Sequence, residues 1–226
     1  MIGLSRGQSR AALVAVLATL PMALSGVAAS ATTLAPTTTT LTVATTAPVA
    51  GQPVRMKATV KENPGTALPT GTVKVTDSGT AVGSGTLVDV RGVMTAIVKV
   101  SLKAGNHSLV ATYSGDVLNT GSASAAVPLV VAKASTTVTV TATALSTPGA
   151  YKIQAWVKVT KPGTGIPTGS VTFVVDGGTG TVVALSSVGH AHIYAKFNSG
   201  SGHSVAVSYP GDSNFIGSVG TLTFTA

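Results

Sequence analysis

Short segments in which apolar and polar residues alternate run from about residue 38 to the last residue. The segment PVRMKATVK is typical, because one face would carry apolar residues and the other polar residues: Val54, Met56, Ala58 and Val60 against Arg55, Lys57, Thr59 and Lys61. Such alternation predicts a β-strand with one buried face. Clusters of Gly, Pro and Asp separate the segments and are typical of turns. The pattern therefore predicts an all-β protein.

The alternating region contains an internal repeat. TTLTV at Thr39 recurs as TTVTV at Thr136, LPTGTVKV as IPTGSVTF, AGNHSL as GSGHSV and YSGD as YPGD, with offsets of 96 to 98 residues. Small offset changes indicate loop insertions in one shared structure. We therefore predict domains at 38–133 and 134–226 after a Thr-rich, extended and solvated lead-in at 32–37. Each would be a Greek-key β-sandwich of about seven strands, and the joint AKAS is too short for a flexible linker.

Two motif pairs carry a resemblance to a known family. PTGTVKV and PTGSVTF, together with GNHSLVATYSGD and GHSVAVSYPGD, resemble the tandem immunoglobulin-like (Ig-like) repeats of bacterial secreted and cell-surface proteins. The resemblance implies two tandem Ig-like Greek-key β-sandwiches that serve as spacers or adhesive modules. It also implies an aromatic residue about three positions after the turn aspartate. Phe215 supplies it in the second half, whereas the first half has Asn119, so we expect Leu118 to take over the packing there.

The N-terminus predicts export. Arg6 and Arg10 precede the apolar run AALVAVLATLPMAL, and the small-residue site ASA ends at Ala31. This is the pattern of a cleaved secretory signal peptide at residues 1–31. Since the run is too short to span a bilayer, we expect no membrane span after cleavage and a secreted, extracellular or cell-surface location. The chain has no cysteine, so packing has to stabilise it without disulfides.

Basic residues outnumber acidic ones. The formal charge is +8, and removal of two arginines with the signal peptide leaves 12 basic against 6 acidic residues, or +6. A positive field favours anionic wall polymers. We expect one basic stripe on an outward sheet face, formed by Arg55, Lys57, Lys61 and Lys99. The alternative is a solvated face that protects the sheet. No motif for binding nucleic acid is present, so no such partner is expected.

Catalytic and metal-binding patterns are weak. The six carboxylates do not pair in the sequence, and several lie in turn motifs such as the DSG of Asp77 and the DGG of Asp176. His190 and His192 lie two apart without a third ligand, and Asp212 with Asn214 offers too few oxygens for calcium. His107 and His203 take the same place in each repeat, which predicts a structural role. We expect neither enzyme activity nor a cofactor.

The single tryptophan marks the candidate binding surface. Four alternating apolar residues need the core, namely Ile153, Ala155, Val157 and Val159. Their alternation places Trp156 on the outward face of its strand with Lys152, Gln154 and Lys158. On the fifth strand of the sandwich, Tyr194 would lie beside Trp156, on the same face as His190, His192 and Lys196. The predicted ligand-binding residues are Trp156, Tyr194, His192 and Lys158. A local bulge that buries Trp156, or packing of Trp156 against the first domain, stays open.

Two functions remain. The leading one is a non-catalytic secreted or cell-surface Ig-like repeat protein that acts as a spacer or an adhesive module. The alternative is a carbohydrate-binding accessory protein that acts through Trp156 and Tyr194 in polysaccharide recognition. The partner would be a cell-wall polysaccharide or a surface protein, and the sequence does not indicate an oligomeric state.

Overall fold

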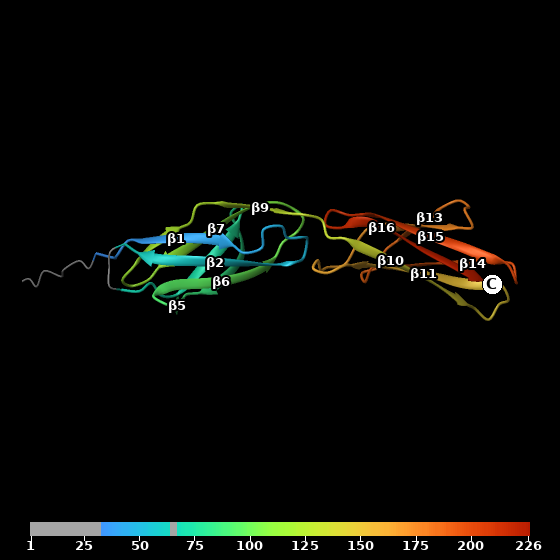
Figure 1. Ribbon diagram of the computed structural model, residues 1–226, viewed down its shortest axis with the longest axis horizontal. Helices are drawn as coiled ribbons and strands as arrows, with labels where there is room; N and C mark the ends of the chain where they lie inside the picture. The colour runs from blue at the N-terminus through green and yellow to red at the C-terminus, as the bar shows by residue number, and fades with distance from the viewer. Residues whose placement is uncertain (1–32, 64–66) are drawn as a thin grey trace, which may run out of the picture. The chain divides into compact units, whose positions relative to one another are not determined.

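Figure 1 shows the computed structural model, which describes residues 33–63 and 67–226. Thr33–Ala226 form one compact unit. The expected signal peptide lies outside the described residues and stays a prediction. Across the described residues, no helix is long and apolar enough to cross a membrane.

Every regular element in the described part of the chain is a β-strand, as the alternation predicts. The strands of the first half are β1 (Thr37–Val43), β2 (Pro53–Glu62), β3 (Thr72–Asp77), β4 (Thr80–Thr86), β5 (Val88–Val90), β6 (Val93–Ser101), β7 (Gly105–Gly115), β8 (Thr120–Ala123) and β9 (Val127–Val131). Those of the second half are β10 (Thr136–Ala144), β11 (Ala150–Val159), β12 (Ser170–Val175), β13 (Thr181–Ala184), β14 (His190–Lys196), β15 (Gly202–Gly211) and β16 (Ile216–Thr225).

The strands form two β-sandwiches (Figure 1). In the first sandwich, β1–β9, one sheet has the order β1-β2-β6-β5 and the other the order β4-β3-β7-β8, with β9 also pairing with β7. In the second sandwich, β10–β16, the orders are β10-β11-β14 and β13-β12-β15-β16. The all-β, Ig-like fold class is therefore confirmed. Separate folding of 38–133 and 134–226 stays a prediction.

Each sandwich has its own hydrophobic core between its two sheets. The first core is built around Met56, Val73 and Tyr113, which are at most 1% exposed. The second is built around Ile153, Phe173 and Tyr209, which are at most 2% exposed. These residues lie at the inward positions of their strands because the side chains of a strand point alternately to its two faces. The inward sets predicted for β2 and β11 are confirmed, with Val159 only partly buried.

The PTG and YxGD motifs bind each other in both sandwiches. In the second, Oδ2 of Asp212 accepts bonds from the Thr168 amide (2.9 Å) and hydroxyl (2.8 Å). In the first, Oδ2 of Asp116 accepts the same two bonds from Thr70 at 2.7 and 2.8 Å. We call these contacts the Thr–Asp clamps. They fasten the start of β3 to the turn after β7, and the start of β12 to the turn after β15.

The other carboxylate oxygen of each clamp organises the turn itself. Oδ1 of Asp212 accepts the amides of Asn214 and Phe215 at 2.8 and 2.9 Å. Gly211 makes the turn possible, because its φ is +91° and a Cβ there would lie 2.6 Å from the Phe215 carbonyl oxygen. The buried Tyr209 hydroxyl donates to the Thr168 carbonyl at 3.1 Å. Tyrosine, glycine and aspartate of the motif thus have distinct structural roles.

The residue after this turn differs between the sandwiches, and the expectation for Leu118 is wrong. Leu118 is 50% exposed, whereas Asn119 is 1% exposed and takes the place of the buried Phe215. Asn119 can be buried because its side-chain Nδ2 donates to both carboxylate oxygens of Asp116, at 3.0 and 3.2 Å. A hydrogen-bonded amide therefore substitutes for the aromatic ring.

The described residues of the lead-in, 33–37, are exposed or half-buried, and one of them also joins the fold. Ala35 forms a parallel bridge with Asn119, and its amide donates to the Leu118 carbonyl at 2.7 Å. Ala134 repeats this arrangement with Phe215 in the second sandwich. The chain therefore enters both sandwiches beside the turn of their Thr–Asp clamp.

The joint between the sandwiches is held by backbone bonds on both sides. The Ala132 amide donates to Pro48 at 2.9 Å, and the Ala134 amide donates to Asn214 at 2.9 Å. In addition, Oδ1 of Asn214 accepts the Ala104 amide at 3.0 Å. The absence of a flexible linker, predicted from the short AKAS segment, agrees with these bonds.

We expect Asp212→Ala to lower the free energy of unfolding of the full chain by about 2 to 3 kcal/mol, since four donors lose a charged acceptor. Asp89→Ala is the matched control, because Asp89 accepts one amide bond, from Gly92 at 2.6 Å. It should cost about 1 kcal/mol or less. Urea unfolding measures both variants. Equal, small losses would contradict the structural role of the clamp.

Candidate functional site

The candidate surface is the outward face of the sheet β10-β11-β14. Lys152, Gln154, Trp156 and Lys158 lie on this face, while Ile153, Ala155 and Val157 point into the core. The pairing of β11 with β10 and β14 has no register shift, so no bulge turns Trp156 inward. Trp156 is half-buried against its neighbours on the face, and Lys158 is exposed.

The expectation that Tyr194 lies beside Trp156 is wrong. The antiparallel register places His190 opposite Trp156, and it places Tyr194 opposite Lys152. His192 lies between them, opposite Gln154. The two large aromatic side chains therefore stand at opposite ends of a row, because the alternation of strand residues fixes each face but not the register between strands.

Four ring-bearing residues form this aromatic row: Trp156, His190, His192 and Tyr194. Successive ring centroids are 4.4, 5.7 and 5.4 Å apart. The planes are tilted by 42°, nearly parallel at 23°, and then perpendicular at 85°. Tyr194 is 66% exposed. The row is therefore continuous but does not form one flat platform.

The electrostatics of the row are set by its histidines and lysines. Burial, followed by the nearby His192 and Lys152, lowers the pKa of His190 below its ordinary value. The amine of Lys158 lies 6.0 Å from the centre of the Trp156 ring, at the limit of a cation–π contact. No Asp or Glu occurs on β10, β11 or β14. The face is therefore aromatic and basic.

The predicted basic stripe occupies the equivalent face of the first sandwich. Arg55, Lys57, Lys61 and Lys99 are all exposed there. Arg55 and Lys99 are direct cross-strand partners, while Lys57 faces Ile97. Lys61 lies about 13 Å along β2 from Lys57, so it does not join this cluster. Among the described residues the ion pairs are two His–Asp contacts, so no carboxylate neutralises the stripe.

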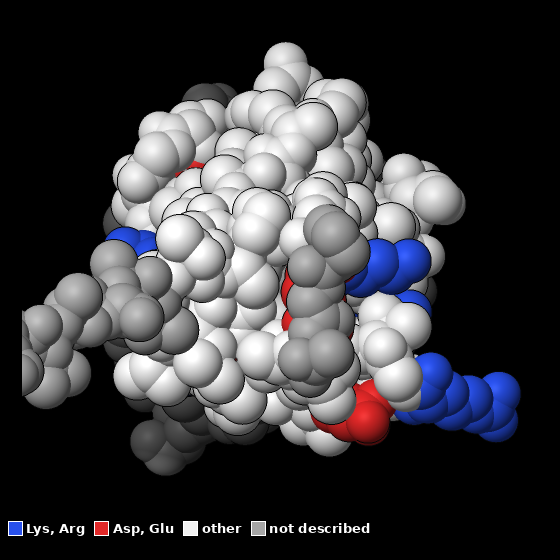
Figure 2. All heavy atoms as spheres, turned by 90° about the vertical axis from the view of Figure 1, so that its left-hand side faces the viewer, with Lys and Arg blue, Asp and Glu red and all other residues white. Residues whose placement is uncertain are grey.

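Charge is sparse on one face of the molecule. In the view of Figure 2, onto the left-hand side of Figure 1, Lys and Arg lie mainly toward one margin and most of the visible surface carries neither sign.

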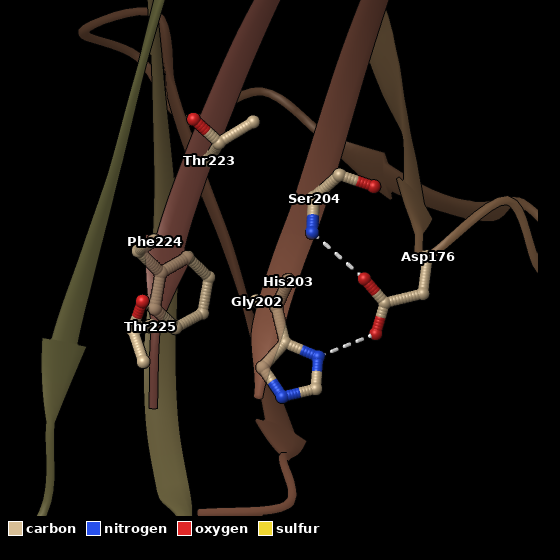
Figure 3. A pocket seen from close by; sticks show the side chains of 7 residues that line it. All are labelled: Asp176, Gly202, His203, Ser204, Thr223, Phe224 and Thr225. Atoms are coloured by element: carbon tan, nitrogen blue, oxygen red, sulfur yellow. Dashed lines mark hydrogen bonds and ion pairs between the residues drawn. The ribbon is translucent and has the colours of Figure 1, made fainter. Parts of the chain in front are cut away.

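A histidine–aspartate contact recurs in both sandwiches. His203 Nδ1 lies 2.8 Å from Oδ2 of Asp176, and its Nε2 lies 3.1 Å from the Asn198 carbonyl oxygen. Oδ1 of Asp176 accepts the Ser204 amide at 2.7 Å (Figure 3). His107 repeats the arrangement with Asp77 at 2.6 Å. The structural role expected for His107 and His203 agrees with this geometry.

The pocket in Figure 3 is an open hollow of about 640 Å³ beside this contact. Asp176, His203, Ser204 and Phe224 are among its lining residues. Both oxygens of Asp176 already accept hydrogen bonds from the protein. The carboxylate is therefore engaged in structure and is not placed as a free base.

Metal ligation has little support. In residues 33–63 and 67–226, no three His, Asp, Glu or Cys residues gather in a group that could hold an ion. At the calcium candidate, both oxygens of Asp212 are already bonded within the Thr–Asp clamp. His190 and His192 stack on each other instead of converging on a point.

Sequence reasoning missed two features of the site. It left His190 out of the binding residues, although this residue links Trp156 to His192. It also did not pair His107 and His203 with Asp77 and Asp176. The second omission had a signal, because in each repeat a histidine lies near the start of β7 or β15 and an aspartate lies at the end of β3 or just after β12.

The fold defines the class of protein: antiparallel Greek-key sandwiches of the immunoglobulin type. Residues 39–141 match the model of the bacterial Ig-like domain, group 3. This part of the chain is similar to that family. The match begins in β1 and ends in β10, and the second sandwich repeats the PTG and YxGD motifs of the matched part.

Several solved structures resemble the chain. The adhesin InvE of Yersinia pseudotuberculosis matches at 17% identity and a TM-score of 0.37, over 83% of this chain and 59% of that chain. The apo β-glucuronidase 3 of Bacteroides uniformis matches at 14% identity and a TM-score of 0.30, over 83% and 25%. This chain therefore spans less than two thirds of either protein. Among curated proteins, no match was found.

We expect the thermal stability conferred by His203 to fall as the pH rises. Both contacts of its ring are acceptors, so the ring donates from both nitrogens as the cation. The hydrogen bond to Asp176, and then the Asn198 carbonyl, raise the pKa of His203. Its contribution is complete below the unfolded pKa of about 6.5 and is lost as the pH passes the higher folded pKa.

Melting temperatures across this pH range, compared between the original chain and His203→Gln, measure that contribution. The difference between the two should shrink as the pH rises. The control is His192→Gln, which removes an outward histidine. A difference for His203→Gln that is independent of pH would show that its ring is not held as a cation.

Proposed function

We propose that this protein is a non-catalytic, secreted or surface-associated binding module, in which the two sandwiches act as a spacer and the aromatic row makes the specific contact. The observation that carries the proposal is the aromatic row on an outward sheet face. Tyr194 is 66% exposed there, and the core does not require it. Tyrosine and tryptophan are the side chains that most often dominate binding energy.

The first sandwich provides an internal comparison. The pair Ala58–Ala96 corresponds to Ala155–Ala191 of the second, so the same outward positions can be compared. Where the second has Trp156 opposite His190, the first has Thr59 opposite Thr95. The shared frame therefore folds without the aromatic row, which supports a binding role for it in the second sandwich.

Carbohydrate binding remains the second candidate. Gln154 and His192 lie side by side between the two large rings, where hydrogen-bonding groups could meet sugar hydroxyls. The unequal ring planes support this less than the leading proposal, because stacking on sugars needs flat exposed rings. Glycans therefore form one arm of the binding test below.

Trp156→Ala tests the binding face. We expect it to cost about 1.5 kcal/mol or less of stability, since the side chain is only half-buried. Phe173→Ala, at a site that is 0% exposed, should cost about 3 to 5 kcal/mol. Binding to a panel of bacterial surface proteins, wall fractions and glycans should weaken at least about tenfold in Trp156→Ala.

Thr59→Ala is the matched control, because Thr59 takes the place of Trp156 on the first sandwich. Binding that is unchanged in Trp156→Ala, or a stability loss as large as that of Phe173→Ala, would contradict the proposed function.

The basic stripe would add weak attraction to anionic wall polymers. Retention on isolated cell walls should fall from low to high salt, because exposed charges are screened within about 8 Å at physiological ionic strength. Arg55→Gln with Lys99→Gln should reduce retention at low salt. The control is Lys74→Gln, an exposed lysine on the other sheet. Retention that does not respond to salt rules out this contribution.

A further inference from the structure

The outer edge of β14 is an open sheet edge. β14 pairs with β11 on one side and ends the sheet β10-β11-β14. The Phe197 amide donates to the Gly149 carbonyl at 2.8 Å, and the Val157 amide to the Gly189 carbonyl at 2.9 Å. These two bonds show which residues of β14 bond to β11, because the backbone groups of successive strand residues point alternately toward and away from the neighbouring strand. The backbone N–H and C=O groups of His192 and Tyr194 therefore point away from β11.

The first sandwich covers the corresponding edge. β6 corresponds to β14, and β5 pairs with it from Val93 to Thr95. β4 lies against the next part, where a Cβ on Gly85 would come 2.8 Å from the Ile97 carbonyl oxygen. In the second sandwich, a tight turn closed by the Gly189 amide on Ser186 replaces β5. β13, the counterpart of β4, contacts β14 without pairing with it, so the described residues supply no strand that pairs with the outer edge of β14.

The side chains show the same difference. Val98 on β6 is 2% exposed, whereas its counterpart Ile193 on β14 is only partly buried. β14 runs for 7 residues and pairs with β11 without a register shift. A regular, uncovered edge of this kind is a template for another strand. Any added strand would place alternate side chains beside His192 and Tyr194 on the outward face.

Charge selects the kind of strand. β10, β11 and β14 carry Lys152, Lys158 and Lys196 on the outward face and no carboxylate. A second copy adding its own β14 would bring Lys196 and no carboxylate, so it would not neutralise the lysines of this face. A segment with carboxylates on the matching face would instead be attracted.

We propose that the outer edge of β14 accepts an extended, acidic polypeptide segment as a fourth strand of the sheet. Backbone bonds to His192 and Tyr194 would hold the segment, and the aromatic row would contact its side chains. The inference rests on the proposed function, because it names the partner class for the same face. It adds a requirement that side-chain contacts alone do not impose, namely free backbone groups on both partners.

Synthetic peptides of about nine residues, a length that covers β14, provide the probes. The acidic probe alternates Val and Glu, and the basic probe replaces Glu with Lys. A third probe keeps the acidic sequence but carries N-methyl groups on the alternate amides that would face the edge. Fluorescence anisotropy with the full chain should show the acidic probe binding at least about tenfold more tightly than either other probe.

Two proline variants test the edge from the protein side. His192→Pro removes an outward amide without breaking the ladder to β11, a position where proline is tolerated. It should weaken binding of the acidic probe about tenfold more than His192→Ala, which removes the same ring but keeps the amide. Ile97→Pro, at the equivalent position of the first sandwich, should leave binding unchanged. Hydrogen exchange of the His192 and Tyr194 amides should slow when the probe binds.

The outcomes separate this inference from the proposed function. Equal binding of the N-methylated probe, unchanged exchange at His192 and Tyr194, or no binding of the acidic probe would each overturn strand addition. The peptide comparison needs no variant, so a proline variant that fails to fold does not affect it. If Trp156→Ala still weakens binding to the surface panel, the proposed function stands while the strand inference fails.

Discussion

The Thr–Asp clamp is the contact on which each sandwich depends. It joins residues 46 positions apart in the first sandwich and 44 apart in the second, through a carboxylate that also orders the following turn. In a chain without cysteine, no covalent bond closes these loops. For Asp116, burial acts to raise the pKa, but its amide and hydroxyl donors hold the pKa of that carboxyl well below its ordinary range. The contact is therefore charged and strong at neutral pH.

The neighbouring tyrosine makes the clamp part of the core. Burial, with the adjacent Asp212, raises the pKa of Tyr209 to about 12, so its hydroxyl stays neutral and donates to Thr168. The same residue fills the core between the sheets. Loop geometry and core packing are thus fixed by adjacent residues of one motif, which explains why PTG and YxGD recur together in both halves. The His–Asp contact also joins β3 to β7 in the first sandwich, and the end of β12 to β15 in the second.

Much of the fold follows from sequence because these constraints are local or periodic. Alternation identified the buried set of β11, and the repeat located both sandwiches. Relations between strands were harder to predict. The position of Tyr194 depends on the register of β14 against β11, which alternation does not specify. The burial of Asn119 depends on an acceptor supplied by Asp116, and a rule that expects an apolar residue there overlooks such a hydrogen bond.

The two sandwiches differ most at outward sheet positions, which the packing of their cores does not restrict. The aromatic row of β11 and β14 stands at the positions that β2 and β6 fill with Thr59, Thr95, Ile97 and Lys99. Exposed aromatic groups on an uncovered edge invite unwanted pairing, which natural sheets commonly prevent with charge or a covering strand. The first sandwich uses both protections, whereas the second keeps lysines around an edge without a covering strand. The lysines of this face would attract a strand that carries carboxylates, and β14 itself carries none, so the proposed acidic segment complements the charge of the edge better than a second copy of β14 does.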